Sequence, residues 1–155
     1  MTGISPTLES LNLPGFKAKK VAIIAAQWHP EICNNLVAGA QLIFESAQIT
    51  YENFKVSGSF ELPLAAQLKL NQGFDGAVVL GLVMRGDTSH FDYICQGVTS
   101  GVMQVSLAKA KPIGFGVLMC DNLQQALERS QVGLGVGNKG EEAALAVLAL
   151  WNMQA

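Results

Sequence analysis

Four short apolar runs alternate with longer segments in which apolar residues recur every three or four positions. The runs have the length of strands buried on both faces, and the longer segments have the spacing of amphipathic helices. The predicted strands span residues 21–26, 49–57, 77–84 and 113–118. The predicted helices span residues 31–47, 63–70, 91–110, 123–130 and 141–153. Strand followed by helix, four times over, predicts an α/β fold with a parallel sheet covered by helices on both faces.

The chain has 155 residues, which suits one domain. Residues 1–18 contain proline and glycine and show no clear period, so we expect an N-terminal arm that is ordered only against another surface. Residues 19–155 are then the single domain. Half of the residues are hydrophobic and 14% are charged. So little charged surface predicts self-association.

The overall charge and the cysteines exclude several classes of protein. A net charge of −2 argues against nucleic acid or an anionic membrane as the main partner. No apolar run approaches the roughly 18 residues of a membrane helix, and the first 20 residues lack a signal-peptide core, so a cytoplasmic protein is expected. Cys33, Cys95 and Cys120 have no metal-ligand spacing and are expected to be small buried hydrophobes. No metal site is predicted.

Polar residues gather directly after the third predicted strand. Gly86 allows close approach of the backbone to a ligand, and Asp87, Thr88 and Ser89 lead into a helix whose first N–H groups can hold an anion. His90 then lies in the first helical turn, where an imidazole suits proton transfer near neutral pH. The same residues are also compatible with an ordinary helix cap and a surface histidine.

Two further residues follow the first and second predicted strands. Trp28 is a good stacking platform for a flat heteroaromatic ring, or else packs over the next helix. Glu61 either accepts hydrogen bonds from ligand hydroxyls or caps a helix. Ligands bind at the carboxyl edge of open parallel sheets, where both residues are expected. The run GLGVGNKG lies between two predicted helices, so it is not a nucleotide-binding loop.

Five segments taken together resemble one family. They are GSFELP at 58–63, RGDTSHFDY at 85–93, PIGFGVL at 112–118, QALER at 125–129 and NKG at 138–140. In this order and at these separations they closely resemble the 6,7-dimethyl-8-ribityllumazine synthase family, from about residue 21 to the last helix.

The resemblance implies a transferase of riboflavin biosynthesis that needs no cofactor. In that reaction 5-amino-6-(D-ribitylamino)pyrimidine-2,4-dione condenses with 3,4-dihydroxy-2-butanone 4-phosphate to 6,7-dimethyl-8-ribityllumazine, releasing phosphate and water. The implied fold is a flavodoxin-like three-layer α/β/α sandwich with a four-stranded parallel sheet. The implied assembly is a homopentamer with active sites at subunit interfaces, and decamers or shells of sixty subunits also occur in the family.

The resemblance also implies roles for individual residues. His90 matches the catalytic acid/base, Trp28 matches an aromatic that stacks on the pyrimidine, and Phe115 and Arg129 match residues that reach the site from a neighbouring subunit. The positions implied to bind the pyrimidine and its ribityl chain are Trp28, Ser59, Phe60, Glu61, Val83, Met84, Phe115 and Lys139. Those implied to bind phosphate are Gly86, Asp87, Thr88 and Arg129.

Three features depart from the family pattern. His29 replaces the more usual asparagine, and Met119 and Cys120 replace a pair that carries hydroxyl groups. The connection from Arg129 to Lys139 is about two residues longer than the commonest form. Because this connection lies near the contacts between pentamers in shells, the sequence favours a free pentamer.

Three other functions are considered beside the lumazine enzyme. They are a protein that binds flavin or lumazine without turnover, a purely structural shell protein, and the archaeal-type riboflavin synthase, which dismutates lumazine. The presence of His90 together with Arg129 argues against the first, since stacking a flavin needs neither residue, and a purely structural shell gives no reason for a histidine beside an anion-binding loop. The segments GDTSHFDY and NKGEEAA fit the lumazine enzyme better than the riboflavin synthase.

Overall fold

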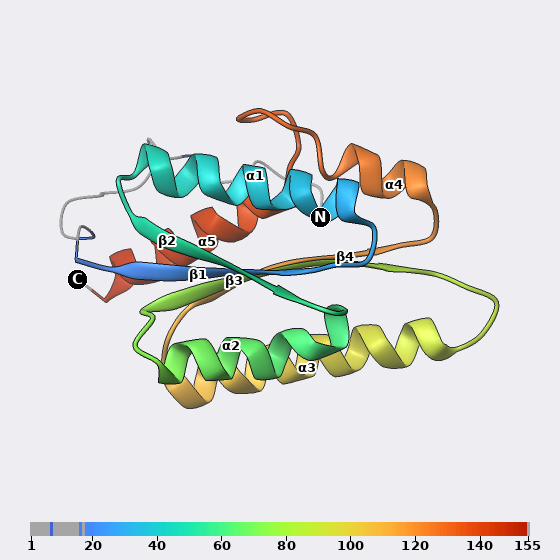
Figure 1. Cartoon of the computed structure of the whole chain (residues 1–155), viewed down its shortest axis with the longest axis horizontal. Helices are drawn as coiled ribbons and strands as arrows, with labels where there is room; N and C mark the ends of the chain where they lie inside the picture. The colour runs from blue at the N-terminus through green and yellow to red at the C-terminus, as the bar shows by residue number, and fades with distance from the viewer. Residues whose placement is uncertain (1–6, 8–15, 17, 155) are drawn as a thin grey trace.

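The computed structural model describes residues 7, 16 and 18–154, which build a sheet between two layers of helices (Figure 1). The strands are β1 (Lys20–Ala26), β2 (Thr50–Val56), β3 (Gly76–Met84) and β4 (Ile113–Cys120). The helices are α1 (Pro30–Ser46), α2 (Leu62–Asn71), α3 (His90–Lys109), α4 (Leu123–Glu128) and α5 (Lys139–Met153), and a short 3₁₀ helix, η2 (Ser59–Glu61), precedes α2. The predicted three-layer α/β fold is confirmed.

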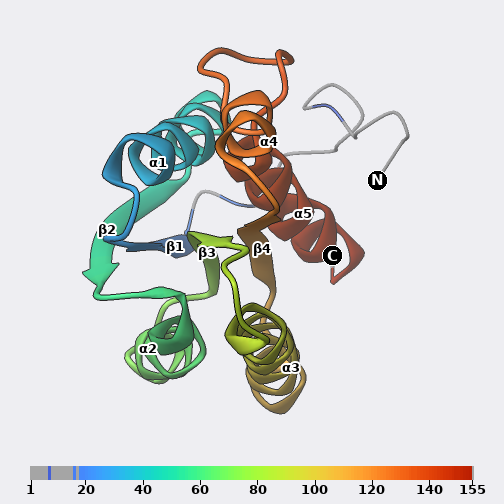
Figure 2. The same cartoon turned by 90° about the vertical axis from the view of Figure 1, so that its right-hand side faces the viewer.

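All strand pairs are parallel, and the strand order is β2-β1-β3-β4. This order agrees with the flavodoxin-like arrangement. The helices α1 and α5 cover one face of the sheet, and α2 and α3 cover the other (Figure 2). The connection from β1 leads to β2 on one side of the sheet, and the connection from β3 leads to β4 on the other, so a crevice is expected between the carboxyl ends of β1 and β3.

Alternation along β1 divides the core into two parts, because successive side chains of a strand point to opposite faces. Ile23 belongs to the cluster under α1 and α5, whereas Ala22 and Ile24 belong to the cluster under α2 and α3. All three side chains are fully buried. This two-sided burial explains why the strand lacks polar residues after Lys20.

Three boundaries differ from the predictions by two residues, and one of them is the end of β4, which runs on to Cys120. The predicted helix at 123–130 ends at Glu128, because Ser130 leaves the helix to pair with Asn138 in an isolated antiparallel bridge. The last helix begins at Lys139, two residues before the predicted start, and the Asn138 side chain caps it by accepting a hydrogen bond from Glu141 N. The 3₁₀ turn of η2 was not predicted.

Most of the predicted arm, residues 1–18, lies outside the described residues, so the division into arm and domain stays a prediction. Phe16 is described and buried, and its ring lies against Trp151 of α5 with the ring centroids 5.8 Å apart. Of the three cysteines, all free, Cys33 and Cys120 are buried as predicted, whereas Cys95 is only partly buried because it lies on the outer side of α3. No helix within the described residues is long and apolar enough to span a bilayer.

Candidate active site

A pocket of 460 Å³ opens at the carboxyl edge of the sheet, where the segments after β1, β2 and β3 meet. Nine of the thirteen predicted site residues line it: Trp28, Ser59, Phe60, Glu61, Val83, Met84, Gly86, Thr88 and His90. They come from three separate parts of the chain, and the strand order brings them together.

The segment after β1 presents an indole to this pocket. Trp28 is 68% exposed, so it does not pack beneath α1, and its ring is available to a ligand. The Cys33 thiol donates a hydrogen bond to the Trp28 carbonyl oxygen at 3.2 Å and so anchors the turn. His29 follows in the left-handed region, with φ 54° and ψ 64°. Asparagine and histidine enter this region more readily than most residues, which accounts for either residue at this position.

The segment after β2 carries a carboxylate beside the indole. A Cβ added to Gly58 would lie 3.2 Å from Glu61 Oε2 and 3.5 Å from Trp28 Cδ1, so Gly58 leaves the space between these groups open. Glu61 occupies the N-cap position of α2, yet its side chain makes no capping hydrogen bond. The alternative that Glu61 is a helix cap is therefore wrong, and its carboxylate lines the pocket instead.

Ser59 lies deeper in the same segment. It is 8% exposed, and its hydroxyl has no hydrogen-bond partner among the described residues. A Cβ on Gly81 of β3 would lie 2.5 Å from this hydroxyl, so the glycine makes room for the serine at the floor of the pocket. This close fit ties the segment after β2 to the centre of the sheet.

The segment after β3 leads from the sheet into α3 and brings His90 to the mouth of the pocket. His90 is exposed and is the first residue of α3, and its backbone N donates to Thr88 Oγ1 at 3.3 Å. Ser89 is the N-cap residue but makes no side-chain cap bond, so Thr88 alone of the predicted capping residues accepts from the helix start. His90 lines the same pocket as Trp28.

Arg85 fixes the start of this segment, and the sequence analysis gave it no role. Its Nε donates to Asp121 Oδ1 at 2.7 Å, its NH1 lies 3.6 Å from Asp92 Oδ1, and its guanidinium stacks over Phe91. The hydrogen bond to Asp121 is the main cause of a raised pKa for Arg85. Arg85 thus links the turn before Gly86 to the end of β4 and to the first turn of α3.

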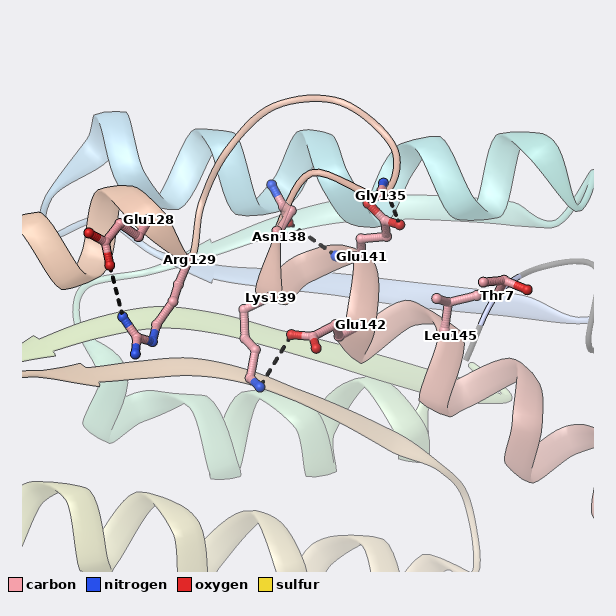
Figure 3. A pocket seen from close by; sticks show the side chains of 10 residues that line it. Thr7, Glu128, Arg129, Gly135, Asn138, Lys139, Glu141, Glu142 and Leu145 are labelled. Carbon is pink, nitrogen blue, oxygen red and sulfur yellow. Dashed lines mark hydrogen bonds and ion pairs between the residues drawn. The ribbon is translucent and has the colours of Figure 1, made fainter. Parts of the chain in front are cut away.

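A second pocket, of 560 Å³, lies beside α4 and α5 and contains two of the remaining predicted residues, Arg129 and Lys139 (Figure 3). Arg129 NH1 donates to Gln125 O at 3.0 Å, and Lys139 Nζ lies 3.2 Å from Glu142 Oε2. Phe115 is partly buried on the side of β4 that faces α2 and α3. Neither Phe115 nor the exposed Asp87 lines either pocket. Within one chain the predicted residues are therefore not all brought together.

Comparison with known proteins agrees with this geometry. The sequence profile of the 6,7-dimethyl-8-ribityllumazine synthase family matches residues 18–155. The chain belongs to this family. Lumazine synthase of Streptomyces coelicolor is 46% identical over 131 residues, covering 84% of this chain and 81% of the relative. That of Paenarthrobacter aurescens is 45% identical over 148 residues, covering 94% of this chain and 91% of the relative. The family match includes the whole lining of the first pocket and that of the second apart from Thr7, and it begins two residues before β1.

The described residues hold no group of three or more histidine, cysteine, aspartate or glutamate side chains placed to bind a metal ion. The polar side chains that line the first pocket are instead the imidazoles of His29 and His90, the carboxylate of Glu61, and the hydroxyls of Ser59 and Thr88. Such groups can accept and donate hydrogen bonds to a polar ligand, and an imidazole can transfer protons near neutral pH.

Proposed function

We propose that this chain is a lumazine synthase that condenses 5-amino-6-(D-ribitylamino)pyrimidine-2,4-dione with 3,4-dihydroxy-2-butanone 4-phosphate, releasing phosphate and water. The observation that carries the proposal is the shared pocket of Trp28, Glu61 and His90 in a chain of this family. Stacking, hydrogen bonding and proton transfer are then available around one ligand.

The chemistry assigns a task to each part of the pocket. The amine of the pyrimidine forms an imine with the ketone and releases water, phosphate is eliminated, and a ring closes with loss of a second water. Each of these steps moves a proton, and His90 carries it between the reacting atoms. The indole of Trp28 stacks on the pyrimidine, Glu61 accepts hydrogen bonds from ribityl hydroxyls, and the backbone at Val83 and Met84 recognises the heterocycle.

The phosphate is bound from two sides in this proposal. Gly86, Asp87 and Thr88 precede the amino end of α3, whose first N–H groups favour an anion. Arg129 completes the site, because a guanidinium can grip phosphate through two hydrogen bonds. Within one chain Arg129 and Lys139 line a different pocket from His90, so we assign them, with Phe115, to the site of a neighbouring subunit.

We propose a homopentamer as the assembly, without further association into shells. Large apolar side chains exposed on α2 and α3 support a subunit contact there: Leu64, Leu68, Tyr93, Met103 and Leu107. Sedimentation of the purified protein should give about five times the mass of the chain. A particle of megadalton size would contradict the free pentamer.

We place the enzyme in the cytoplasm. Cys33, Cys95 and Cys120 are free thiols, as expected in a reducing compartment. Localisation of a tagged full-length chain in cells tests this assignment.

The test of the activity is to mix the purified protein with the two substrates and follow lumazine absorbance together with phosphate release, against a control without protein. We expect saturable formation of lumazine and phosphate in equal amounts. Tight binding of lumazine or riboflavin without acceleration would instead make the chain a flavin-binding relative. Formation of riboflavin from dimethylribityllumazine alone would identify a riboflavin synthase.

A further inference from the structure

Backbone pairing joins the two ends of the connection between α4 and α5, and these paired ends, residues 129–130 and 138–139, are called the base. Lys139 N donates to Arg129 O at 2.8 Å, and Ser130 and Asn138 form an antiparallel bridge directly inside that bond. Arg129 and Lys139, the two cations of the second pocket, are therefore neighbours across a short paired base. Their separation depends on this base and not on the path of residues 131–137.

The side chain of Asn138 fixes this base to the rest of the fold. It is 2% exposed, and its Nδ2 donates to Asn35 O at 2.9 Å and to Gln131 O at 3.0 Å. Its Oδ1 accepts from Glu141 N at 3.1 Å. One buried amide thus ties α1, the start of the connection and the first turn of α5 together, with its donors and its acceptor all partnered.

Two glycines show how closely this amide fits. A Cβ on Gly39 of α1 would overlap the Asn138 side chain, and a Cβ on Gly140 would overlap the backbone carbonyl of Leu36. The start of α5 is therefore seated directly against α1. Such a tightly packed polar group cannot shift without moving the backbone on either side of it.

The cations themselves are held much less firmly. The Arg129 and Lys139 side chains are 53% and 34% exposed, and both extend away from the connection on the same side, whereas Asn138 turns back toward α1 (Figure 3). Long exposed side chains can bind one phosphate together only when their backbones are held at a suitable separation. The rigid element that holds these two backbones is the base anchored by Asn138.

We propose that Asn138 is a positioning residue for the phosphorylated substrate: it sets Arg129 and Lys139 at the spacing that binds the phosphate. Lys139, which the resemblance places among the residues for the pyrimidine and its ribityl chain, is thereby assigned to the phosphate instead, because it lines the same pocket as Arg129 and not the pocket of Trp28. This inference rests on the proposed function. It goes beyond a capping role, because two of the three hydrogen bonds of the side chain lead to α1 and to Gln131 and contribute nothing to the cap.

The variant Asn138→Ser separates capping from positioning. Serine is a good N-cap residue, so α5 keeps its cap, but the hydroxyl is too short to reach the carbonyls of both Asn35 and Gln131. We expect KM for the butanone phosphate to rise about tenfold, because displacing a binding group by about 1 Å has effects of this order or larger. KM for the pyrimidine should stay within about twofold of wild type, since its proposed pocket is not touched.

The matched control is Lys111→Met. Lys111 Nζ also makes two side-chain to backbone hydrogen bonds, to Leu70 O at 3.0 Å and Phe74 O at 2.9 Å, but it lies at the opposite edge of the sheet, before β4. This variant should lose stability and leave both KM values unchanged. Equal changes in the two KM values of folded Asn138→Ser, or no change in either, would overturn the proposal.

A double variant adds a second criterion. In an Arg129→Ala background the phosphate site has already lost one cation, so Asn138→Ser should raise KM for the butanone phosphate by less than it does alone. Fully multiplicative effects would show that Asn138 acts independently of Arg129. Where Asn138→Ser does not fold, Asn138→Asp serves in its place, because it keeps an acceptor for Glu141 N and loses both donors.

Hydrogen exchange measures the base without any reliance on activity. The amides of Lys139 and Gln131, which donate to Arg129 O and Gly137 O, should exchange faster in Asn138→Ser than in wild type, while strand amides do not change. An unchanged exchange rate at Lys139 contradicts the inference. If wild type makes no lumazine, the proposed function fails separately, and the exchange rates still decide whether Asn138 holds the base together.

Discussion

At the scale of single residues, the role proposed for His90 is the one that a substitution tests most directly. It is the first residue of α3, its backbone N donates to Thr88 Oγ1, and it lines the same pocket as Trp28 and Glu61. None of the described hydrogen bonds or ion pairs uses its imidazole. The residue thus has a clear place in the proposed reaction and little visible part in holding the fold.

Replacing His90 with alanine should therefore reduce kcat by about 10²-fold or more, because general acid/base catalysis by a positioned side chain contributes on this scale. The assembly and its thermal unfolding should stay as in wild type. Steady-state lumazine formation and sedimentation measure the two effects. Full activity in His90→Ala would remove this residue from the mechanism.

Cys33 connects the pocket to stability at alkaline pH. Burial raises the pKa of its thiol from the ordinary 9.0 to about 11. The unfolded chain therefore loses this proton at lower pH than the folded chain, so the contribution is fully present below pH 9 and is lost as pH rises toward 11. We expect the free energy of unfolding to fall across this window.

Urea unfolding of wild type and Cys33→Ala at pH 8 and at about pH 10.5 tests this expectation. Wild type should lose more stability than the variant between the two pH values, since other ionising groups affect both proteins alike. Equal losses would show that the Cys33 thiol titrates at the same pH in both states.

At the scale of elements, the connection between α4 and α5 has a fixed base and a projecting tip. The tip exposes three apolar side chains, those of Val132, Leu134 and Val136. Each is followed by a glycine with a positive φ, namely Gly133, Gly135 and Gly137. The described hydrogen bond that ties this tip back is from Gly135 N to the Glu141 carboxylate. The two residues by which this connection exceeds the commonest length can therefore lie in the tip without changing the paired base.

Deletion of Gly133 and Leu134 should leave KM for both substrates within about twofold of wild type, because the Arg129–Lys139 backbone bond lies outside the deleted segment. Steady-state kinetics with each substrate varied in turn measures the effect. A selective rise in KM for the butanone phosphate would mean that the tip, and not the base, sets the separation of the cations.

The regular elements could be predicted because their signals are local. Strands such as β3 are continuous apolar runs, and the sites at strand ends, including Trp28 and Glu61, follow from the carboxyl-edge rule for parallel sheets. The end of α4 was missed because it depends on pairing between Ser130 and Asn138. No local pattern reports such a contact.

The same limit explains the site residues that were not predicted. Arg85 binds Asp121, 36 residues away, and Asn138 binds the carbonyl of Asn35, 103 residues away. Arg85 and Asn138 lie in the motifs at 85–93 and 138–140, and this was the only indication from the sequence that they matter. Their partners are defined only by the fold, so the sequence alone assigned no role to either side chain.

At the scale of the whole molecule, the proposed site is divided. His90 and Arg129 line different pockets of one chain, and the proposed function joins them across a subunit interface. A chain that has lost one of these residues can still offer the other to its neighbour. This division makes the assembly testable through activity alone.

Coexpression of His90→Ala chains with Arg129→Ala chains should give more activity than either variant has alone, measured at a butanone phosphate concentration too low to saturate Arg129→Ala. With random assembly about one quarter of the interfaces combine an intact His90 with an intact Arg129, so about one quarter of wild-type activity is expected. Mixing the two purified oligomers without subunit exchange is the control. No recovery in coexpressed oligomers would place both residues in one subunit's site.

The division of the proposed site between two subunits also means that a bound ligand stabilises the contact between them. A substrate that contacts His90 of one subunit and Arg129 of the next binds the assembled form and not the separated chain, so by mass action it stabilises the assembly. Dilution should then dissociate the enzyme more readily when it is empty than when it is saturated. The supply of substrate would then set both the rate of the reaction and the fraction of chains that are assembled into active oligomers.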